Sequence, residues 1–461
     1  MSPTSSTRTS AEATKSAAAV PAVDARRGDD ALPDPTSTAP LLEVSDLKVS
    51  FPSEDGRVNA VRGVNLSVAR GEVLALVGES GSGKSVTSTA VMGLLDESAE
   101  VTGSVRLHGT ELLGRPDGYM SRIRGSQVAM VFQDPLSALT PVYTVGAQIV
   151  EALRIHHPEM SEAAAHKRAV ELLDLVGIPN PQVRAKAYPH EFSGGMRQRA
   201  VIAIAIANDP DLIIADEPTT ALDVTVQAQV LDVLAARRAT GSALLLISHD
   251  LAVVGQVCDR ILVMKDGEVV ESGPSQMVLT SPRHAYTRRL LAAVPSAASR
   301  GRLLATDARA PQRQNLSEGP DAEPLLAARD LVKDYPGPGG TVRRAVGGVD
   351  VEVRPGQTLG VVGESGSGKS TLARLLIALT EPDTGTIALD AEPWSPLPDR
   401  RRRTRRHRIQ IINQDPISSF DPRYSVREII SEPLRSPAAG RLLPSRAQVA
   451  ERVREVAELV G

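Results

Sequence analysis

The octapeptide GESGSGKS occurs twice in this chain of 461 residues, at residues 78–85 and again at residues 363–370. The segments that precede it repeat as well, because PLLEVSDLKVSF at 40–51 returns as PLLAARDLVKDY at 324–335. The offset stays near 285 residues throughout, as it does when one structural unit has been duplicated. The sequence therefore predicts two copies of one domain.

Composition excludes several classes of protein. Lys and Arg total 52 against 55 Asp and Glu, a net charge of −3, so the basic excess of nucleic-acid binders is missing. The single cysteine, Cys258, excludes an internal disulfide and a Cys-ligated metal cluster within one chain, and fits a reducing compartment. We expect it to be a small buried apolar residue. The longest apolar run, residues 200–207, is too short to span a bilayer, which takes about 20 residues.

Hydrophobic periodicity predicts the fold class. Residues 73–77 form a short β-branched run typical of a buried strand, and a helical pattern follows at 85–95. Residues 212–215 and 244–247 are further buried-strand patterns. Strands separated by helical segments indicate an α/β domain, with helices packed on a parallel sheet.

The repeated octapeptide fits the phosphate-loop pattern G-x-x-x-x-G-K-[ST] and stands between an expected strand and an expected helix. Its glycines let successive backbone N–H groups face phosphate oxygens. Lys84 brings a positive charge to the β- and γ-phosphates, and the hydroxyl of Ser85 can ligate Mg²⁺. The sequence therefore predicts a P-loop NTPase that binds ATP and Mg²⁺.

Two further elements carry the expected chemistry. The apolar run LIIADEP places the Asp216 carboxylate at the end of a strand, where it can hold Mg²⁺. Glu217 follows directly and is placed to polarise an attacking water. His249 comes after the apolar run LLLIS and can donate a hydrogen bond to the γ-phosphate.

The segment EFSGGMRQR at 191–199 decides the class, since its Ser193 lies 23 residues before Asp216. With Lys84, Gln133 and His249 in this order, the chain resembles the nucleotide-binding domain of ATP-binding-cassette (ABC) proteins. The resemblance implies one complete P-loop cassette and an incomplete second copy. It also implies that SGG closes over the ATP of an opposing cassette. Here Phe192 and Met196 depart from the usual LSGGQ signature, a change expected to affect packing more than chemistry.

The resemblance also assigns roles residue by residue. It implies that Phe51 and Tyr335 stack on adenine, that Gln133 and Gln414 sense Mg²⁺ and the membrane partner, and that Asp223 links the two sites. The implied catalytic residues are Glu217, His249, Gln133 and Lys84. The implied magnesium ligands are Ser85, Gln133, Asp216, Ser370 and Gln414. The implied ATP-binding residues are Phe51, Gly78, Glu79, Ser80, Gly81, Ser82, Gly83, Lys84, Ser85, Ser193, Gly194, Gly195, Asp223, Tyr335, Gly363, Glu364, Ser365, Gly366, Ser367, Gly368, Lys369, Ser370, Thr371 and Gln414.

Two segments point to a subgroup of the family. SPRHAYTRRLLAAVP at 281–295 resembles the extension of oligopeptide and dipeptide importer ATPases, although Ala285 departs from its usual HPYT. YPHEFSGGMRQR at 188–199 is also typical of that subgroup. The chain is similar to fused double ATPases of the peptide, nickel and glutathione importers. Implied partners are two permease subunits, an extracytoplasmic solute-binding protein and a second ATPase domain, with a peripheral location at the cytoplasmic face of the membrane.

The expected domain boundaries follow from the repeats and from composition. They are a disordered tail at 1–39, a first cassette at 40–280, the extension at 281–295, a linker at 296–323 and the first part of a second cassette at 324–461. At the spacing of the first copy, the second signature would lie near residue 474 and the second magnesium aspartate near residue 497. We therefore expect this form to bind ATP and to hydrolyse it poorly unless two chains pair.

Two other functions stay open from the sequence: a soluble twin-cassette ATPase that acts on ribosomes or DNA, and a remnant that does not hydrolyse ATP. The transported solute is not determined by the sequence. The arginine run at 400–408 could suggest nucleic acid, but it matches the stretch that holds Arg122 and Arg124 in the first copy. We interpret it as a solvated loop and expect no nucleic-acid partner.

Overall fold

The computed structural model describes residues 40–53, 56–219, 224–295, 299, 323–336, 341–364, 366–413, 419–435 and 445–460. Three expected site residues, Asp223, Ser365 and Gln414, lie outside these ranges, as do the expected tail and most of the expected linker. The described residues form two compact units. The first unit lies within Met1–Pro189, Ala200–Pro218 and Val233–His284, and the second within His190–Arg199, Thr219–Asp232 and Ala285–Gly461.

A six-stranded sheet forms the centre of the first unit, in the order β10-β9-β3-β8-β7-β6. All neighbouring strands are parallel except β10, which pairs antiparallel with β9. The strands are β3 (Val73–Val77), β6 (Val128–Val131), β7 (Leu212–Asp216), β8 (Ala243–Ser248), β9 (Arg260–Lys265) and β10 (Glu268–Pro274). Every residue of β3, β6, β7 and β8 is buried, as expected for parallel strands covered on both faces.

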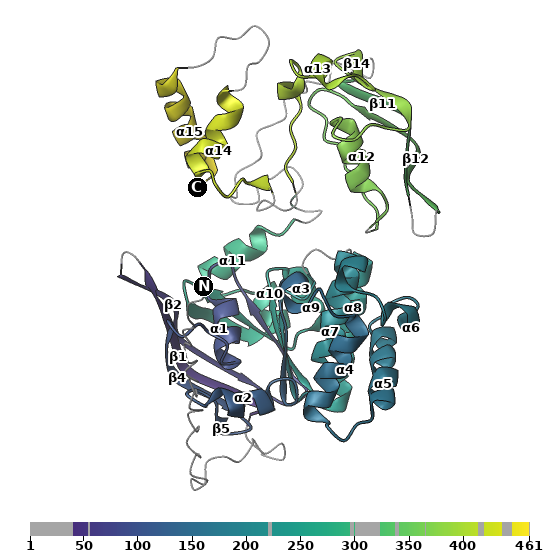
Figure 1. The fold of residues 1–461 in the computed structure, drawn as a ribbon. Helices are drawn as coiled ribbons and strands as arrows, with labels where there is room; N and C mark the ends of the chain where they lie inside the picture. Colours follow the sequence, from purple (N-terminus) through teal and green to yellow (C-terminus); the bar gives the residue numbers. More distant parts are fainter. Residues whose placement is uncertain are drawn as a thin grey trace, which may run out of the picture. The chain divides into compact units, whose positions relative to one another are not determined.

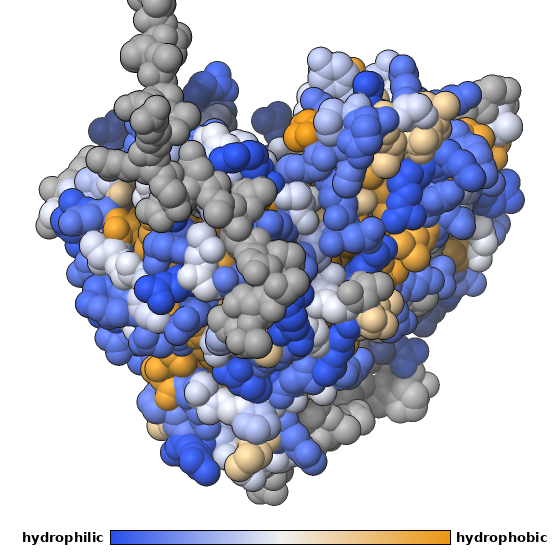
Figure 2. Space-filling model, turned by 90° about the horizontal axis from the view of Figure 1, so that it is seen from below, coloured by the Kyte–Doolittle hydropathy of each residue, from blue (hydrophilic) through white to orange (hydrophobic). Residues whose placement is uncertain are grey.

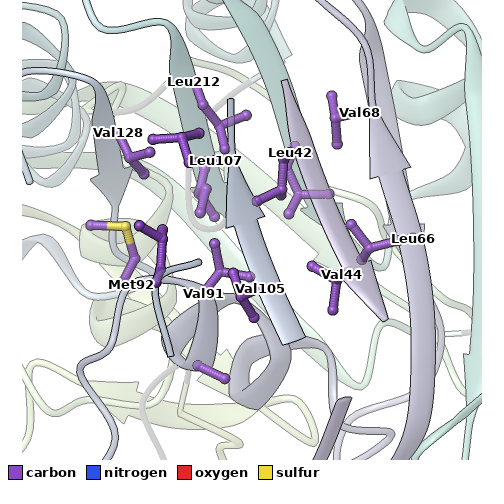
Figure 3. Close-up of a cluster of buried hydrophobic side chains, with 14 of the residues drawn as sticks. Leu42, Val44, Leu66, Val68, Val91, Met92, Val105, Leu107, Val128 and Leu212 are labelled. Atoms are coloured by element: carbon purple, nitrogen blue, oxygen red, sulfur yellow. The ribbon is translucent and has the colours of Figure 1, made fainter. Parts of the chain in front are cut away.

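An antiparallel sheet in the order β2-β1-β4-β5 packs beside it. Its strands are β1 (Leu42–Ser53), β2 (Gly56–Val68), β4 (Glu100–Leu107) and β5 (Thr110–Glu111). One apolar cluster joins the two sheets, since Leu42, Val105 and Leu107 pack together with Val128 and Leu212 (Figure 3). This shared core holds the antiparallel sheet against the strands that carry the site.

Helices cover the sheets of the first unit, and Figure 1 shows α1 beside the antiparallel strands. Side-chain caps start several of them, as when the Thr144 hydroxyl accepts from the Ala147 N–H at 3.3 Å and the Asp250 carboxylate from the Ala252 N–H at 2.9 Å. The helices are α1 (Lys84–Val91), α2 (Asp117–Ile123), α3 (Pro135–Ala138), α4 (Val145–His156), α5 (Glu162–Leu175), α6 (Pro181–Arg184), η2 (Arg237–Thr240), α9 (Leu251–Val257) and α10 (Ser275–Thr280). Three more elements fall partly or wholly outside this unit: η1 (Pro189–Glu191), α7 (Gly194–Ala205) and α8 (Val224–Ala236).

The second unit repeats the antiparallel sheet, in the order β12-β11-β13-β14. Its register is that of the first copy, since Leu326 pairs with Leu389 as Leu42 pairs with Leu107. The elements are α11 (Ala285–Ala292), β11 (Leu326–Pro336), β12 (Val342–Val353), α12 (Lys369–Leu376), β13 (Thr384–Leu389), β14 (Glu392–Ser395), α13 (Asp399–Arg402), η5 (Arg406–Arg408), α14 (Val426–Arg435) and α15 (Arg446–Val460).

The expected buried strands at 73–77, 212–215 and 244–247 are confirmed as β3, β7 and β8. The expected helix at 85–95 is shorter and ends at Val91, because Gly93 adopts a left-handed conformation with φ of 61°. Cys258 is buried as expected, and this burial raises the pKa of its thiol to about 12.

No helix among the described residues is long and apolar enough to cross a membrane. The face of the molecule seen in Figure 2 is mainly hydrophilic, and its apolar atoms form separate small groups.

The interpretation of residues 400–408 as a solvated loop is wrong in part. These residues form α13, a turn and η5, and the side chain of Arg402 is buried with 6% of its surface exposed. Ion pairs with Asp399, Asp390 and Glu392 give the segment this fixed structure.

Candidate nucleotide-binding site

The loop between β3 and α1 is held open by glycines. Gly81 and Gly83 have φ of 79° and 98°, the left-handed region that side chains with a Cβ rarely adopt. A Cβ at Gly83 would lie 2.4 Å from the carbonyl oxygen of Ala60. No other residue type therefore fits at Gly83 without a shift of β2, and the backbone can curve closely around an anion at the start of α1.

Lys84 lies inside this loop. Its ammonium donates to the carbonyl oxygens of Gly78 at 2.9 Å and Glu79 at 2.7 Å, and only 5% of the residue is exposed. Burial lowers the pKa of this ammonium, and the carboxylates of Glu217 and Asp216 act in the opposite direction. The loop therefore carries a desolvated cation, whose attraction for a phosphate is stronger than that of a hydrated one.

Ser85 and Asp216 bring two oxygen ligands together at the end of β7. The Ser85 hydroxyl donates to Oδ1 of Asp216 at 3.1 Å, although the residues are 131 positions apart. Only 4% of Asp216 is exposed, and this burial raises the pKa of its carboxyl against the effect of the Ser85 hydrogen bond. A hydroxyl beside a buried carboxylate fits Mg²⁺, which prefers oxygen ligands and would neutralise the buried charge.

Glu217 lies between two of the expected site residues. Gln133 donates from Nε2 to Oε2 of Glu217 at 3.0 Å, and Nδ1 of His249 lies 3.1 Å from Oε1. The backbone of Glu217 has φ of 48°, and its N–H donates to the carbonyl oxygen of Ile247 at 2.9 Å. The structure thus fixes the backbone of this glutamate and holds each of its carboxylate oxygens from a different side.

Phe51 and Ser193, two other expected residues of the first copy, lie on different elements. Phe51 lies near the end of β1 and packs, partly buried, against the apolar core. Ser193 lies directly before α7, in residues of the second unit, and its hydroxyl accepts from the Met196 N–H at 3.4 Å. The described structure therefore assembles Lys84, Ser85, Asp216, Glu217, Gln133 and His249 in one unit.

The second copy forms a similar loop in a different setting. Gly366 and Gly368 have φ of 81° and 96°, and Lys369 donates to the carbonyl oxygens of Gly363 at 2.6 Å and Glu364 at 2.7 Å. Ser370 is exposed, as is Tyr335, whose ring lies 5.8 Å from the Lys333 ammonium. Ser367 and Thr371 flank Lys369 in the loop and α12.

One structural element of the site was not singled out from the sequence. The turn at Asp266 and Gly267 supports the phosphate loop, because the Gly267 N–H donates to the Ser82 carbonyl oxygen at 3.1 Å. In turn the Gly267 carbonyl oxygen accepts from the Arg62 N–H at 2.8 Å. The Asp-Gly dipeptide between two apolar strands is a recognised turn signal, but it gives no indication of what the turn will contact.

Comparison with known proteins decides the family. The sequence profile described as "ABC transporter" matches residues 61–220 and again residues 346–461. This chain belongs to the ABC transporter family. The two matched segments contain the two phosphate loops, in agreement with the internal repeat and with one full and one partial copy of the cassette.

Relatives within the ABC transporter family match most of the chain. The oligopeptide transport ATP-binding protein OppD of Mycobacterium tuberculosis is 46% identical over 491 residues, which cover 92% of this chain and 79% of the relative. The peptidoglycan transport ATP-binding protein YejF of Agrobacterium fabrum is 43% identical, over 87% of this chain and 72% of the relative. The glutathione import ATP-binding protein GsiA of Salmonella typhimurium is 42% identical, over 88% and 69%.

Proposed function

We propose that this chain is the ATP-binding and ATP-hydrolysing subunit that energises import of peptides or related small solutes through separate membrane permeases. The observation that carries the proposal is the cluster in the first unit, where Gln133 and His249 hold Glu217 beside the buried pair of Ser85 and Asp216. Relatives named for oligopeptide, peptidoglycan and glutathione transport support the solute class.

ATP binding rests on the loop at 78–85. Its backbone N–H groups and the N-terminus of α1 face the β- and γ-phosphates, and the Lys84 ammonium moves from the loop carbonyl oxygens to the phosphate oxygens. Phe51, near the end of β1, stacks on the adenine. Tyr335, Gly363, Ser365, Lys369, Thr371 and their neighbours in the second loop take the corresponding roles for a second ATP.

Ser85 and Asp216, with Gln133, are the residues that would hold Mg²⁺, and Ser370 and Gln414 are their counterparts in the second copy. When bound, Mg²⁺ would neutralise negative charge on the β- and γ-phosphates. Burial raises the pKa of the Asp216 carboxyl because it makes the free carboxylate costly, and a bound cation would offset that cost.

Glu217 acts as the general base for hydrolysis. Its carboxylate accepts the proton of the attacking water while that water adds to the γ-phosphorus and ADP leaves. Gln133 and His249, which contact its two oxygens at 3.0 and 3.1 Å, position this carboxylate, and His249 can also donate to the γ-phosphate. A general base of this kind typically accelerates the reaction about 10²–10⁴-fold.

The proposed assembly needs partners. Ser193, Gly194 and Gly195 close over an ATP held by an opposing cassette, from a second chain or from a complete second copy, and Asp223 links the two sites. Two permease subunits and an extracytoplasmic solute-binding protein complete the importer, with this chain at the cytoplasmic face of the membrane. The proposed domains keep the boundaries given above, with the cassette at 40–280 and its extension at 281–295.

An uptake experiment tests this function. In cells that lack the native gene but keep its permeases, we expect the chain to restore ATP-dependent uptake of labelled di- and oligopeptides or of glutathione, and the Lys84→Ala variant not to. The proposal would be contradicted if the Lys84→Ala variant restored uptake of all these solutes. It would also be contradicted if the fully expressed parent chain restored uptake of none of them.

A further inference from the structure

Residues 399–408, with the sequence DRRRRTRRHR, concentrate positive charge in the second unit. They hold seven arginines against one aspartate, a net charge of +6, whereas the remaining 451 residues carry a net charge of −9. The corresponding stretch of the first copy contains Arg115, Arg122 and Arg124 only. The charge is therefore a property of this segment and not of the cassette as such.

Four of the seven arginines form ion pairs within the second unit. Arg405 pairs with Glu392 at 3.2 Å and donates to the carbonyl oxygen of Pro393 at 3.1 Å, and both of these partners lie in β14. Arg402 pairs with Glu381 and Arg408 with Asp390, both outside the segment, while Arg402 and Arg406 also pair with Asp399 inside it. These contacts fix the backbone of the segment, so that binding does not have to order the backbone.

The other three arginines point into solvent. Arg400, Arg401 and Arg403 are exposed, and none of them forms an ion pair with a described residue. His407 is exposed next to them and is likewise unpaired within the described part of the chain. We call Arg400, Arg401 and Arg403 the arginine patch.

We propose that the arginine patch binds the anionic phospholipid headgroups of the membrane at which the transporter works. The proposal deepens the function proposed above and rests on it for the presence of a membrane. Each arginine held near an anionic bilayer surface strengthens binding about fivefold, so the three together contribute about 100-fold. Guanidinium groups suit this role because they pair with phosphate through two parallel N–H···O bonds.

Single-stranded nucleic acid is the other polyanion that such a patch could bind, and the structure favours it less. Proteins that bind single strands combine basic side chains with exposed aromatic rings on which bases stack. Trp394, the aromatic residue beside Arg405, is fully buried, and the Arg405 guanidinium lies 5.8 Å from its ring centre. This indole ring therefore offers no exposed face on which a base could stack.

Vesicle sedimentation tests the proposal on the full chain. The probes are vesicles of equal parts phosphatidylglycerol and phosphatidylcholine, and vesicles of phosphatidylcholine alone. We expect the parent chain to bind the anionic vesicles, to be released by high salt, and to leave the neutral vesicles unbound. The variant with Arg400→Gln, Arg401→Gln and Arg403→Gln should bind the anionic vesicles about 100-fold more weakly.

A charge-matched control separates the patch from the effect of net charge. Arg122→Gln, Arg154→Gln and Lys186→Gln together remove three exposed positive charges that form no ion pair with a described residue of the first unit, and this variant should bind like the parent. Equal loss of binding in both variants, or no loss in either, would overturn the proposal. The proposal would also be overturned if the parent chain bound neither kind of vesicle but bound single-stranded RNA, and if this RNA binding were lost in the arginine-patch variant.

An ATP titration distinguishes a failure of the arginine patch from a failure of the proposed function. Titration of each variant with ATP and Mg²⁺ shows whether the first site is intact, and the arginine-patch variant should bind ATP like the parent. Normal ATP binding with unchanged vesicle binding refutes the arginine patch alone. Absent ATP binding in the parent chain refutes the proposed function and leaves the vesicle result to be judged by itself.

Discussion

The two phosphate loops have the same sequence and nearly the same backbone, yet their surroundings differ. Val77, at the end of β3, is fully buried, whereas its counterpart Val362 is 95% exposed. Val131, at the end of β6, is also fully buried, and its counterpart Ile412 is 99% exposed. The loop is thus a local structure that eight residues can form, while the burial of the strands beside it depends on distant parts of the chain.

The difference has a clear topological cause. In the first copy β3 lies between β8 and β9, and β6 pairs with β7. These partners come from 212–265, far along the sequence. The described part of the second copy contains no strand that corresponds to β7, β8 or β9. The described part of the second copy likewise contains no counterpart of Asp216 or Glu217, which lie at and after the end of β7 in the first copy.

The largest expected effect concerns the glutamate that only the first copy has in the described structure. Glu217→Gln keeps the size of the side chain and a contact to Gln133 or His249, but it cannot accept a proton. We expect ATP turnover to fall about 10²–10⁴-fold, with ATP affinity unchanged. Turnover is measured in the assembly with the permeases. A variant that turns over at the parent rate would show that Glu217 is not the general base.

The next effect compares the two loops directly. Lys84→Ala removes a buried cation from the phosphates, and charged hydrogen bonds of this kind contribute about 1.5–3 kcal/mol, or roughly 10–150-fold in affinity. Lys369 is the matched control, with the same loop contacts but more exposure. Calorimetric titration with ATP should show a larger loss for Lys84→Ala than for Lys369→Ala. Equal losses of ATP affinity would mean that the burial of the loop lysine does not affect how strongly it binds ATP.

We expect the two copies to differ in stability as well, with the second copy unfolding at a lower urea concentration. The apolar cluster of the first copy contains 29 buried residues among those described, against 11 in the cluster around Trp394. Trp394 is the only tryptophan of the chain, so its fluorescence reports on the second copy alone. We expect its fluorescence to change at lower urea than the main loss of far-UV circular dichroism. Coincident transitions would indicate that both copies unfold as one cooperative unit.

The smallest expected effect is a pH dependence that comes from Asp216. Burial raises the pKa of its carboxyl above the ordinary 3.8, so the folded chain binds a proton more tightly than the unfolded chain. The free energy of unfolding therefore falls as pH rises through the window between the two values, and stays reduced above it. Without nucleotide, Asp216→Asn should raise the melting temperature at neutral pH, and this gain should vanish below pH 3.8.

The control for this experiment is a carboxyl group whose pKa is lowered in the folded chain. Hydrogen bonds from the backbone and the side chain of Ser98 lower the pKa of the exposed Asp96 carboxyl. The folded chain then binds a proton less tightly, so Asp96→Asn should not stabilise the chain at neutral pH. Stabilisation by both variants would point to net charge as the cause, and not to the burial of Asp216.

Local sequence patterns were enough to predict several parts of this protein. The repeated octapeptide predicted both phosphate loops, since glycines at left-handed positions fix the backbone wherever the loop occurs. Apolar runs predicted β3, β7 and β8, because fully buried parallel strands must be apolar throughout. The order of Lys84, Gln133, Ser193, Asp216 and His249 indicated the family before any distance was known.

Only the tertiary structure decided how these residues meet. The hydrogen bond of Ser85 with Asp216 joins β7 to the start of α1, and the contacts of Glu217 join three strand ends, because parallel strands bring their carboxyl ends to one edge of a sheet. The fixed form of the arginine run was misjudged, since its ion pairs involve acids up to 21 residues away. Pairing between distant strands and charges depends on packing, which local sequence patterns do not contain.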